Sequence, residues 1–460
     1  MGATSEGLGW KVKKEKAQYK INLPVLSDEE EGVIIEIARM FKELSKKEEV
    51  SGRDEASEKL GALIEEYCAS NSISIDREQF GYLCKMALLH TYGFCAIDPL
   101  LSDNGIEEIA VIGLNKPIYV YVREKGWKRT NAYFTSTEVL TNIINKMARV
   151  MGRRVTFQSP CLNTILPDGS RLHASIPPIS PYELTIRKFR ENPISVPELI
   201  SLNTFSQESL GVLWLLMQSD LSVIISGNTS SGKTTTLNAL FSFVPLSERV
   251  LITEETPEIN IPHEHVVRLV SNRELGISMS DLVADSLRMR PDRVIVGEAR
   301  TKEEVGALIE TILSGQARGS YATFHAQSGK ETLNRMRSLG VLPIDLQSID
   351  LIIVQRRMMR YDTKTKRSTE IRRVVEIAEI DKEKEGSLVP LFSYDNEKDM
   401  LVKSNNGSPL LERVRKSFNM TKGELNEEIK RRSSFLNELR KKGTSFQDSV
   451  SSIQRFAYAD

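Results

Sequence analysis

Cysteine is scarce in this sequence, whose 460 residues include only Cys68, Cys84, Cys95 and Cys161. No two of them form a C-x-x-C pair, so the pattern predicts neither a disulfide framework nor a zinc site. We expect reduced core residues of a cytosolic protein. Long apolar runs are also lacking. The longest candidate, residues 106–122, is interrupted by glycine, asparagine, proline and charged residues, so we expect no membrane span and no apolar signal core.

A net charge of one sign is lacking too, because 62 Lys and Arg residues balance 62 Asp and Glu residues. This balance gives no global bias toward nucleic acid or an acidic surface, although it leaves local patches open. The sequence does contain 40% hydrophobic and 27% charged residues, which is the composition of a soluble globular protein. A chain of 460 residues is too long for one ordinary core, so we expect two or three domains.

The most specific motif is Gly227-Asn-Thr-Ser-Ser-Gly-Lys-Thr234, which follows the apolar run 223–225 and leads into a helical pattern. This strand, glycine loop and helix are typical of the phosphate-binding loop of nucleoside triphosphatases. Glycines let successive backbone N–H groups point into one concavity, where a helix N-terminus favours an anion. Lys233 is expected to reach the β- and γ-phosphates, and Thr234 to offer its hydroxyl to Mg²⁺. The residues expected to bind ATP are Gly227, Asn228, Thr229, Ser230, Ser231, Gly232, Lys233, Thr234 and Thr235.

Carboxylates follow two further apolar runs. The first run is 294–296, and Glu298 follows it, where the carboxyl end of a buried strand is expected. Open α/β sheets bind ligands at that edge. We predict that Glu298 holds Mg²⁺ together with Thr234 and orients the attacking water. Glu254 and Glu258 follow the run 251–253. Clustered carboxylates raise one another's pKa unless a cation intervenes, so these two are candidates for polarising water, and a solvated acidic turn is the alternative.

A histidine, His325, ends the strand-like segment 321–324. A lone histidine usually has a structural role. Thr323 and His325, however, alternate onto the same face of a strand that is expected in the nucleotide sheet. Two interpretations therefore stay open, a sensor of the γ-phosphate and a structural residue.

The order of patterns along the chain predicts its domains. Strand-like runs and helical patterns alternate between residues 223 and 325, which is typical of a parallel sheet covered by helices. β-Branched runs separated by turn residues between 106 and 134 predict an antiparallel meander. Capping boxes at Ser27, Thr135 and Thr421 predict helix starts. The expected parts are a flexible tail (1–26), a helical segment (27–75), an α+β N-terminal domain (76–190), a linker or hinge (191–200), a P-loop ATPase domain (201–405) and a C-terminal helical extension (406–460).

Together these motifs resemble the type II/IV secretion ATPase family, which includes pilus assembly motors, DNA-transfer ATPases and the archaeal flagellum motor. The resemblance covers about residues 80–400. It rests on the phosphate loop and on the segments 254–258, 288–300 and 321–326, which follow the family's order. The helical end of the chain resembles the archaeal branch most. The resemblance implies the α/β class, with a RecA-like P-loop NTPase domain that has a mostly parallel sheet and follows a smaller α+β domain.

The resemblance also implies functional residues and partners. Segments 166–171 and 185–189 are similar to those that carry phosphate-contacting arginines, so Arg171 and Arg187 are expected in the cleft between the domains. The catalytic set implied is Glu298, Glu254, Glu258, His325, Arg171 and Arg187. The family further implies ATP and Mg²⁺ as cofactors, a homo-hexamer, an integral membrane platform protein as partner, and peripheral association with the inner face of the membrane. No stable complex with nucleic acid is expected.

The resulting expectation is a cytoplasmic, membrane-associated ATPase that drives assembly or secretion of a type IV pilus-like filament. Two alternatives use the same sheet. One is a nucleic-acid translocase, whose turnover DNA or RNA would stimulate, and the other is a nucleotide-gated scaffold with negligible turnover. The basic segment 356–373 is either a contact for a subunit, anionic lipid or a platform protein, or a solvated hairpin.

Overall fold

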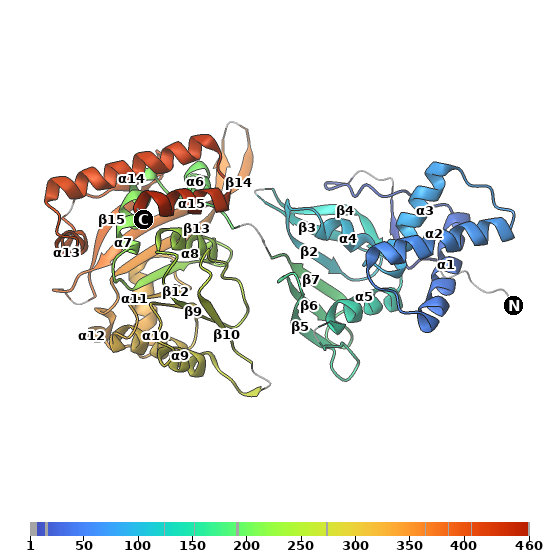
Figure 1. The fold of residues 1–460 in the computed structure, drawn as a ribbon, viewed down its shortest axis with the longest axis horizontal. Coiled ribbons are helices and arrows are strands. Elements are labelled where there is room, and N and C mark those ends of the chain that lie inside the picture. Colours follow the sequence, from blue (N-terminus) through green and yellow to red (C-terminus); the bar gives the residue numbers. More distant parts are fainter. Residues whose placement is uncertain are drawn as a thin grey trace. The chain divides into compact units, whose positions relative to one another are not determined.

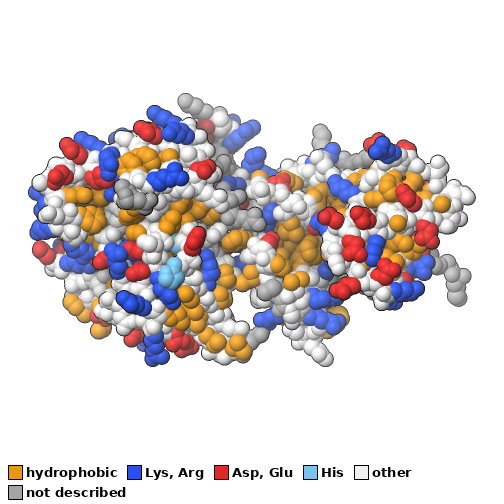
Figure 2. All heavy atoms as spheres, viewed as in Figure 1, with side chains coloured by type: hydrophobic (Ala, Val, Ile, Leu, Met, Phe, Trp, Pro, Cys, Tyr) orange, Lys and Arg blue, Asp and Glu red, His pale blue; other side chains and the backbone are white. Residues whose placement is uncertain are grey.

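The computed structural model describes residues 7–13, 17–123, 125–150, 152–189, 193–272, 275–363, 365–384, 386–405 and 407–458. The chain separates into two compact units, Met1–Phe189 and Arg190–Asp460 (Figure 1). Within the described ranges, no helix has both the length and the apolar character needed to cross a membrane. Basic and acidic side chains are mixed over the visible face of the second unit, as the balanced composition leads one to expect (Figure 2).

The first unit is built on a sheet whose described strands follow the order β1-β4-β3-β2-β7-β6-β5. Every neighbouring pair in it is antiparallel. The strands are β1 (Trp10–Val12), β2 (Ile106–Ile112), β3 (Pro117–Val122), β4 (Gly126–Phe134), β5 (Cys161–Ile165), β6 (Arg171–Ser175) and β7 (Glu183–Arg187). The helices are α1 (Asp28–Lys47), α2 (Arg53–Ser70), α3 (Arg77–Thr91), α4 (Asp98–Leu101) and α5 (Thr137–Arg149), with a 3₁₀ turn at Cys95–Ile97. One continuous core joins the helices of residues 28–91 to this sheet.

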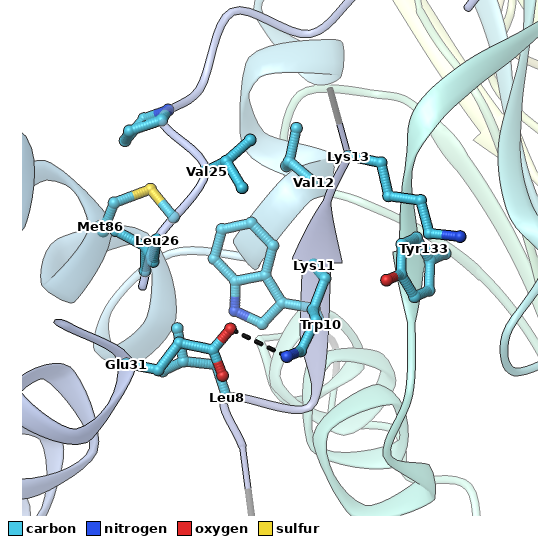
Figure 3. A pocket seen from close by; sticks show the side chains of 11 residues that line it. Leu8, Trp10, Lys11, Val12, Lys13, Val25, Leu26, Glu31, Met86 and Tyr133 are labelled. Carbon is cyan, nitrogen blue, oxygen red and sulfur yellow. Dashed lines mark ion pairs between the residues drawn. The ribbon is translucent and has the colours of Figure 1, made fainter. Parts of the chain in front are cut away.

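Part of the predicted flexible tail, residues 1–26, is folded. Trp10–Val12 pairs with β4, and Trp10 is only 2% exposed, with its Nε1 donating to His90 Nδ1 at 3.3 Å. Lys11 forms an ion pair with Glu31 at 3.2 Å (Figure 3). The prediction of a tail is therefore wrong for 7–13 and 17–26, while 1–6 and 14–16 lie outside the described residues. The missed signal was the alternation of apolar and basic residues from Trp10 to Lys13.

The capping predictions are confirmed at two of three positions. At Ser27 the hydroxyl accepts from the Glu30 N–H at 3.3 Å and the Glu30 carboxylate accepts from the Ser27 N–H at 2.8 Å. Thr421 caps α14 in the same way. The prediction is wrong at Thr135, because its N–H donates to the Gly9 carbonyl at 2.8 Å instead of to a downstream glutamate. Helix α5 is therefore capped one residue later, by Ser136.

The cysteines are free thiols, but not all of them lie in the core. Cys68 and Cys95 are buried and Cys84 is partly buried. Cys161 is exposed, so the prediction of a core residue is wrong there. It is the first residue of β5, where exposed and buried side chains alternate, and it lies on the face opposite to that of the buried Leu162.

The second unit has a mixed sheet, with described strands in the order β10-β9-β11-β12-β8-β13-β14-β15-β16. The pairs from β10 to β13 are parallel, and those from β13 to β16 are antiparallel. The strands are β8 (Val223–Gly227), β9 (Val250–Glu254), β10 (Val266–Val270), β11 (Arg293–Ala299), β12 (Gly319–Phe324), β13 (Leu351–Asp362), β14 (Arg367–Ile380), β15 (Leu388–Asp395) and β16 (Met400–Lys403). The helices are α6 (Val196–Ser201), α7 (Gln207–Met217), α8 (Lys233–Leu240), α9 (Met279–Leu287), α10 (Lys302–Ser314), α11 (Gly329–Ser338), α12 (Pro343–Leu346), α13 (Pro409–Ser417), α14 (Lys422–Lys442) and α15 (Phe446–Ala457), with a 3₁₀ turn at Phe241–Phe243.

Both faces of this sheet are covered, because successive strand residues point to opposite sides. Val223 and Ile225 of β8 belong to a core that includes α7, α8 and the C-terminal helices. Ile224, between them, belongs to a second core that includes residues of α9, α10 and α11. Figure 1 shows these two groups of helices on either side of the strands.

The C-terminal helices are part of the first of these cores. Gly211 of α7 lies so close to α14 that a Cβ on it would be 2.2 Å from Ser433 Oγ. Trp214 stacks on Phe243 with ring centroids 5.0 Å apart, and Phe456 of α15 lies 5.3 Å from the same indole. Residues 409–457 thus complete the hydrophobic core behind α8.

The predicted linker, residues 191–200, is partly helical. Residues 191 and 192 lie outside the described part of the chain, and α6 begins at Val196. The Ser195 side chain accepts from the Glu198 N–H, and Pro197 sits in the first turn, where its missing N–H costs no helical hydrogen bond. A linker is therefore the wrong assignment for 196–200.

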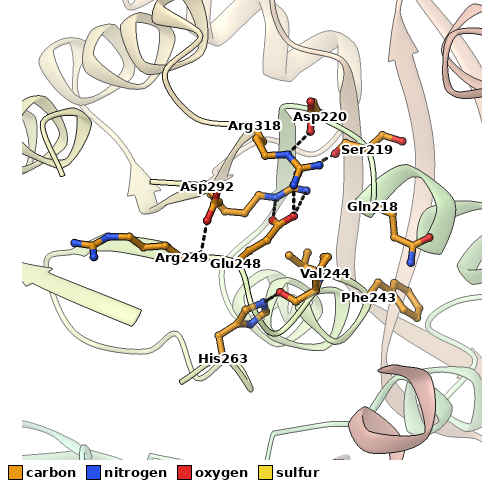
Figure 4. Close-up of polar contacts among 12 residues, drawn as sticks. Gln218, Ser219, Asp220, Phe243, Val244, Glu248, Arg249, His263, Asp292 and Arg318 are labelled. Carbon is orange, nitrogen blue, oxygen red and sulfur yellow. Dashed lines mark hydrogen bonds and ion pairs between the residues drawn. The ribbon is translucent and has the colours of Figure 1, made fainter. Parts of the chain in front are cut away.

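A buried ionic cluster joins the amino ends of β11 and β12 (Figure 4). Arg293 is fully buried, and its guanidinium donates to the Glu248 carboxylate, the Ser219 carbonyl and the Tyr321 hydroxyl. Arg318 donates to the same Glu248 carboxylate at 2.7 Å. Because Glu248 is the shared acceptor, it neutralises a charge that has no access to water.

Candidate functional site

The phosphate loop leaves β8 at Gly227 and enters α8 at Lys233, as the motif predicts. Two positions have left-handed backbone, Ser230 with φ +59° and Gly232 with φ +100°. At Gly227 a Cβ would lie 2.1 Å from the Gln355 carbonyl oxygen. The loop therefore needs glycine at 227 for space and at 232 for conformation.

Lys233 and Ser231 give this loop the character of an anion site. The Lys233 side chain is almost entirely buried, and its ammonium donates to the carbonyls of Gly227 and Asn228, both at 3.3 Å. Ser231 Oγ is buried and has no hydrogen-bond partner among the described residues. A positive charge folded over the loop and a free buried donor suit phosphate oxygens, so the residues present fit a bound triphosphate.

Parallel pairing brings the predicted catalytic residues to one edge of the sheet. Strands β9, β11, β12 and β8 are neighbours in that order. Their carboxyl ends carry Glu254, Glu298, His325 and Gly227 respectively, His325 being the residue just after β12. Side chains predicted from four separate segments thus lie along the ligand-binding edge of an open sheet.

Glu254 is 3% exposed and shapes the turn that follows β9. Its Oε1 accepts from the N–H of Glu258 at 2.7 Å and from that of Ile259 at 2.9 Å. Its Oε2 lies 3.8 Å from Arg268 Nη1. Burial raises the pKa of Glu254 to about 7 despite these bonds. A Cβ on Gly297 would come within 2.9 Å of Glu254 Cγ, which accounts for the glycine before Glu298.

Glu258 is the carboxylate in contact with the phosphate loop. Its Oε2 accepts a hydrogen bond from Thr234 Oγ1 at 3.3 Å. The turn held by Glu254 therefore delivers Glu258 to the hydroxyl that was predicted to bind Mg²⁺. This contact favours a site role for Glu258 over a merely solvated acidic turn.

Glu298 contacts an imidazole and a guanidinium. One carboxylate oxygen contacts His325 Nε2, and the other accepts from Arg300 Nη2. Burial pushes the pKa of Glu298 upward, but the bonds from His325 and Arg300 outweigh it and lower that pKa to about 2. Arg300 also donates to Glu255 at 3.0 Å. Glu298 is accordingly ionised at neutral pH, and His325 is brought into the site.

The metal prediction names Thr234 and Glu298, and the structure pairs them with different residues. Thr234 contacts Glu258, whereas Glu298 contacts Arg300 and His325. No cluster of three or more His, Cys, Asp or Glu side chains within the described ranges could hold a metal by itself. Mg²⁺ in nucleotide sites takes most of its ligands from phosphates and water, with one or two protein groups. The Thr234 hydroxyl and the nearby Glu258 fit such a donor set.

Arg171 and Arg187 are brought together in the first unit. They are directly opposed on β6 and β7, and Glu108 of β2 is the next register partner of Arg187. Because they belong to the other unit, their contact with the nucleotide stays a prediction.

Three site residues were missed in the sequence. Arg300 could have been found, because it follows Glu298 by two residues at a strand end. Gln355 and Thr236 could not, since Gln355 lies on β13, more than a hundred residues beyond the loop. Thr236 Oγ1 donates to Gln355 Oε1 at 2.7 Å, directly beside Gly232.

Comparisons with known proteins agree with this geometry. The family model for type II/IV secretion system proteins matches residues 93–440. An uncharacterized protein of Methanocaldococcus jannaschii is 33% identical over 369 residues, covering 76% of this chain and 64% of that protein. A second one from the same organism is 38% identical over 222 residues, covering 45% of this chain and 31% of that protein. The chain thus spans less than two thirds of the length of either relative.

Solved structures with partial similarity to the chain were also found. The ATPase DotB of Legionella pneumophila is similar over 60% of this chain and 78% of that chain, at 21% identity and a TM-score of 0.46. The family match spans most of the sequence and includes the phosphate loop and every carboxylate at the sheet edge. The chain therefore belongs to the type II/IV secretion ATPase family.

Proposed function

We propose that this protein binds ATP with Mg²⁺ at the phosphate loop and hydrolyses it to drive a secretion or pilus-type machine. The observation that carries the proposal is that the phosphate loop, Glu258 and Glu298 lie at the same edge of the sheet. There Thr234 Oγ1 is 3.3 Å from Glu258 Oε2. Family membership supports the ATPase activity.

Binding is the task of the loop itself. The backbone N–H groups between Gly227 and Lys233 surround the phosphates, and the Lys233 ammonium exchanges its two carbonyl partners for β- and γ-phosphate oxygens. The Thr234 hydroxyl, backed by Glu258, would hold Mg²⁺. When bound, Mg²⁺ would neutralise part of the negative charge of the triphosphate.

Hydrolysis needs a water aimed at the γ-phosphate. Glu298 is ionised, so it can accept a hydrogen bond from that water, and Arg300 and His325 fix the orientation of its carboxylate. Glu254 holds Glu258 in place through two backbone N–H groups. In this arrangement His325 is suited to sense the γ-phosphate, and Arg171 and Arg187 supply positive charge from the first unit.

We base a proposal for the larger assembly on family membership. We take the working form to be a homo-hexamer of the archaeal branch, attached to the inner face of the cell membrane through an integral membrane platform protein. ATP offers contacts to the arginines of the first unit that ADP lacks, and this difference would drive movement between the units.

Substitution of Lys233 by Ala tests the site. ATP turnover should fall by roughly 10²-fold or more, because the phosphates lose the buried ammonium of Lys233. Lys330→Ala, an exposed lysine on α11, is the matched control and should keep full turnover. Steady-state phosphate release measures both. Turnover of the Lys233 variant equal to that of the control would remove the assignment.

A second variant separates binding from chemistry. Glu298→Gln should retain binding of Mg-ATP by calorimetry while hydrolysis falls. Stimulation of the wild-type ATPase by DNA or RNA, with a strong salt dependence, would favour a nucleic-acid translocase instead. Tight binding with negligible turnover in the wild type would favour a nucleotide-gated scaffold.

A further inference from the structure

Strand β13 is bonded to the start of the phosphate loop by the side chain of Asn228. Asn228 Nδ2 donates to the Arg357 carbonyl at 3.0 Å, and Asn228 Oδ1 accepts from the Arg357 N–H at 2.9 Å. The parallel register of β8 and β13 ends at Gly227 and Gln355. The carboxamide of Asn228 therefore carries the ladder one step farther, after the backbone of β8 has turned into the loop.

The same strand also holds the far end of the loop. Gln355 is 2% exposed, and its Oε1 accepts from Thr236 Oγ1 in α8 at 2.7 Å. Its Nε2 lies 2.9 Å from the point where a Cβ of Gly232 would stand. Thr236 is fully buried, so water does not compete for this bond.

Between these two attachments the loop contains a strained non-glycine residue and a glycine with left-handed backbone. Ser230 and Gly232 both have positive φ, and the hydrogen bond from the Ser231 N–H to the Asn228 carbonyl is 3.2 Å long. A loop fixed at both ends keeps its N–H groups convergent before a ligand arrives. A loop without these bonds must be ordered during binding, which weakens affinity.

We propose that Asn228 and Gln355 are positioning residues that hold the phosphate loop in its triphosphate-binding form. The inference rests on the proposed function, since it concerns the same site. The Asn228 side chain acts through the backbone of β13, while the predicted contact of Asn228 with phosphate belongs to its backbone N–H group. Gln355 acts through Thr236 and the surface of Gly232 in the same manner.

Asn228→Ala with Arg357→Ala as control tests the first bond pair. The control removes the Arg357 side chain but keeps the backbone N–H and carbonyl that Asn228 uses. Asn228→Ala should weaken Mg-ATP binding about tenfold, since two hydrogen bonds of modest net strength are lost, and the control should stay within about twofold of wild type. Isothermal calorimetry with Mg-ATP on the full chain measures this.

Kinetics separate positioning from simple loss of folded protein. A positioning role raises the KM for ATP about tenfold and leaves kcat within about twofold, whereas partial unfolding lowers kcat at constant KM. Wild type that binds and an Asn228→Ala variant with unchanged KM would overturn the inference and leave the proposed function intact. Wild type that fails to bind Mg-ATP would overturn the proposed function itself.

A double-mutant cycle tests the second attachment. Thr236→Val and Gln355→Leu each remove one partner of the 2.7 Å bond at similar volume. Each single variant should weaken Mg-ATP binding about fivefold. The double variant should lose no more affinity than the single variant that binds Mg-ATP less tightly, because both substitutions remove the same interaction. Losses that multiply to about 25-fold would show independent effects and overturn the role of this bond.

Discussion

Glu254 shows how burial changes the chemistry of a single residue at the sheet edge. Its carboxyl is almost fully enclosed, and one of its oxygens is committed to the N–H groups of Glu258 and Ile259. Burial raises its pKa from 4.5 to about 7. The proton is thus held more tightly in the folded chain than in the unfolded chain, and ionisation of Glu254 destabilises the fold.

A pH prediction follows for Glu254. Below about pH 4.5 the carboxyl is neutral in both states, and between pH 4.5 and 7 only the unfolded chain ionises, so the free energy of unfolding falls as pH rises. The loss should reach about 3 kcal/mol above pH 7. Urea unfolding without nucleotide, at pH 4 and pH 8, measures it against Glu254→Gln, which cannot ionise. Parallel profiles for the two proteins would contradict the prediction.

The sequence predicts three carboxylates near the nucleotide, but it does not distinguish the contacts that each of them makes. Glu254, Glu258 and Glu298 were all expected near the nucleotide, and all lie at the carboxyl edge. That Glu254 supports the turn while Glu258 meets Thr234 depends on the chain folding back between residues 254 and 259. No spacing rule encodes this, because it is set by burial and by backbone donors that become available only in the folded turn.

Elements of the second unit are held together at the edge opposite the phosphate loop. Glu248 accepts hydrogen bonds from Arg293, the first residue of β11, and from Arg318, which precedes β12. Arg293 also binds the Ser219 carbonyl after α7. The cluster thus sets where two central strands begin, and its stability depends on one shared acceptor.

Removal of that acceptor charge should be costly. Glu248→Gln leaves Arg293 buried without a counter-charge, so the free energy of unfolding should fall by about 3 kcal/mol or more. Asp220→Asn is the control, because Asp220 pairs with Arg318 where both side chains are at least half exposed, and it should cost less than about 1 kcal/mol. Urea unfolding compares them. Equal losses of unfolding free energy in the two variants would refute the buried Glu248–Arg293 pair as the source of this stability.

Elements with local signals were predictable, and those with distant partners were not. The strand, loop and helix around Gly232 and the caps at Ser27 and Thr421 follow from neighbouring residues. Strand β1 was missed because its hydrogen-bond partners on β4 lie over a hundred residues away. The sequence does not predict helix α6, because a proline inside a helix usually breaks it. Pro197 lies in the first turn, where proline is tolerated, and only the structure shows that position.

The whole molecule consists of two units with separate cores. The first core contains buried residues from Leu8 to Ile186, and the cores of the second unit draw on residues from Val196 to Ile453. Chain length predicts two or three domains, and the change of pattern along the chain predicts where they divide. The relation of Arg171 and Arg187 to the phosphate loop is a property of both units together, and neither spacing nor periodicity reports it.

Separate cores predict separate unfolding. Differential scanning calorimetry of the full chain should resolve two transitions, since each unit buries its own apolar surface. Glu248→Gln should lower the midpoint of one transition by roughly 5–10 °C and leave the other in place. A single transition that shifts as a whole would contradict independent units.

The aromatic packing behind α8 has a consequence for synthesis of the chain. Phe243 follows the helix that leaves the phosphate loop, and the Trp214 ring that stacks on it also meets Phe456, more than two hundred residues later. During translation the loop and its strands emerge from the ribosome long before this last aromatic ring is made. The core of the second unit therefore stays open on one side until α15 has cleared the exit tunnel, and chaperones have that interval in which to bind it.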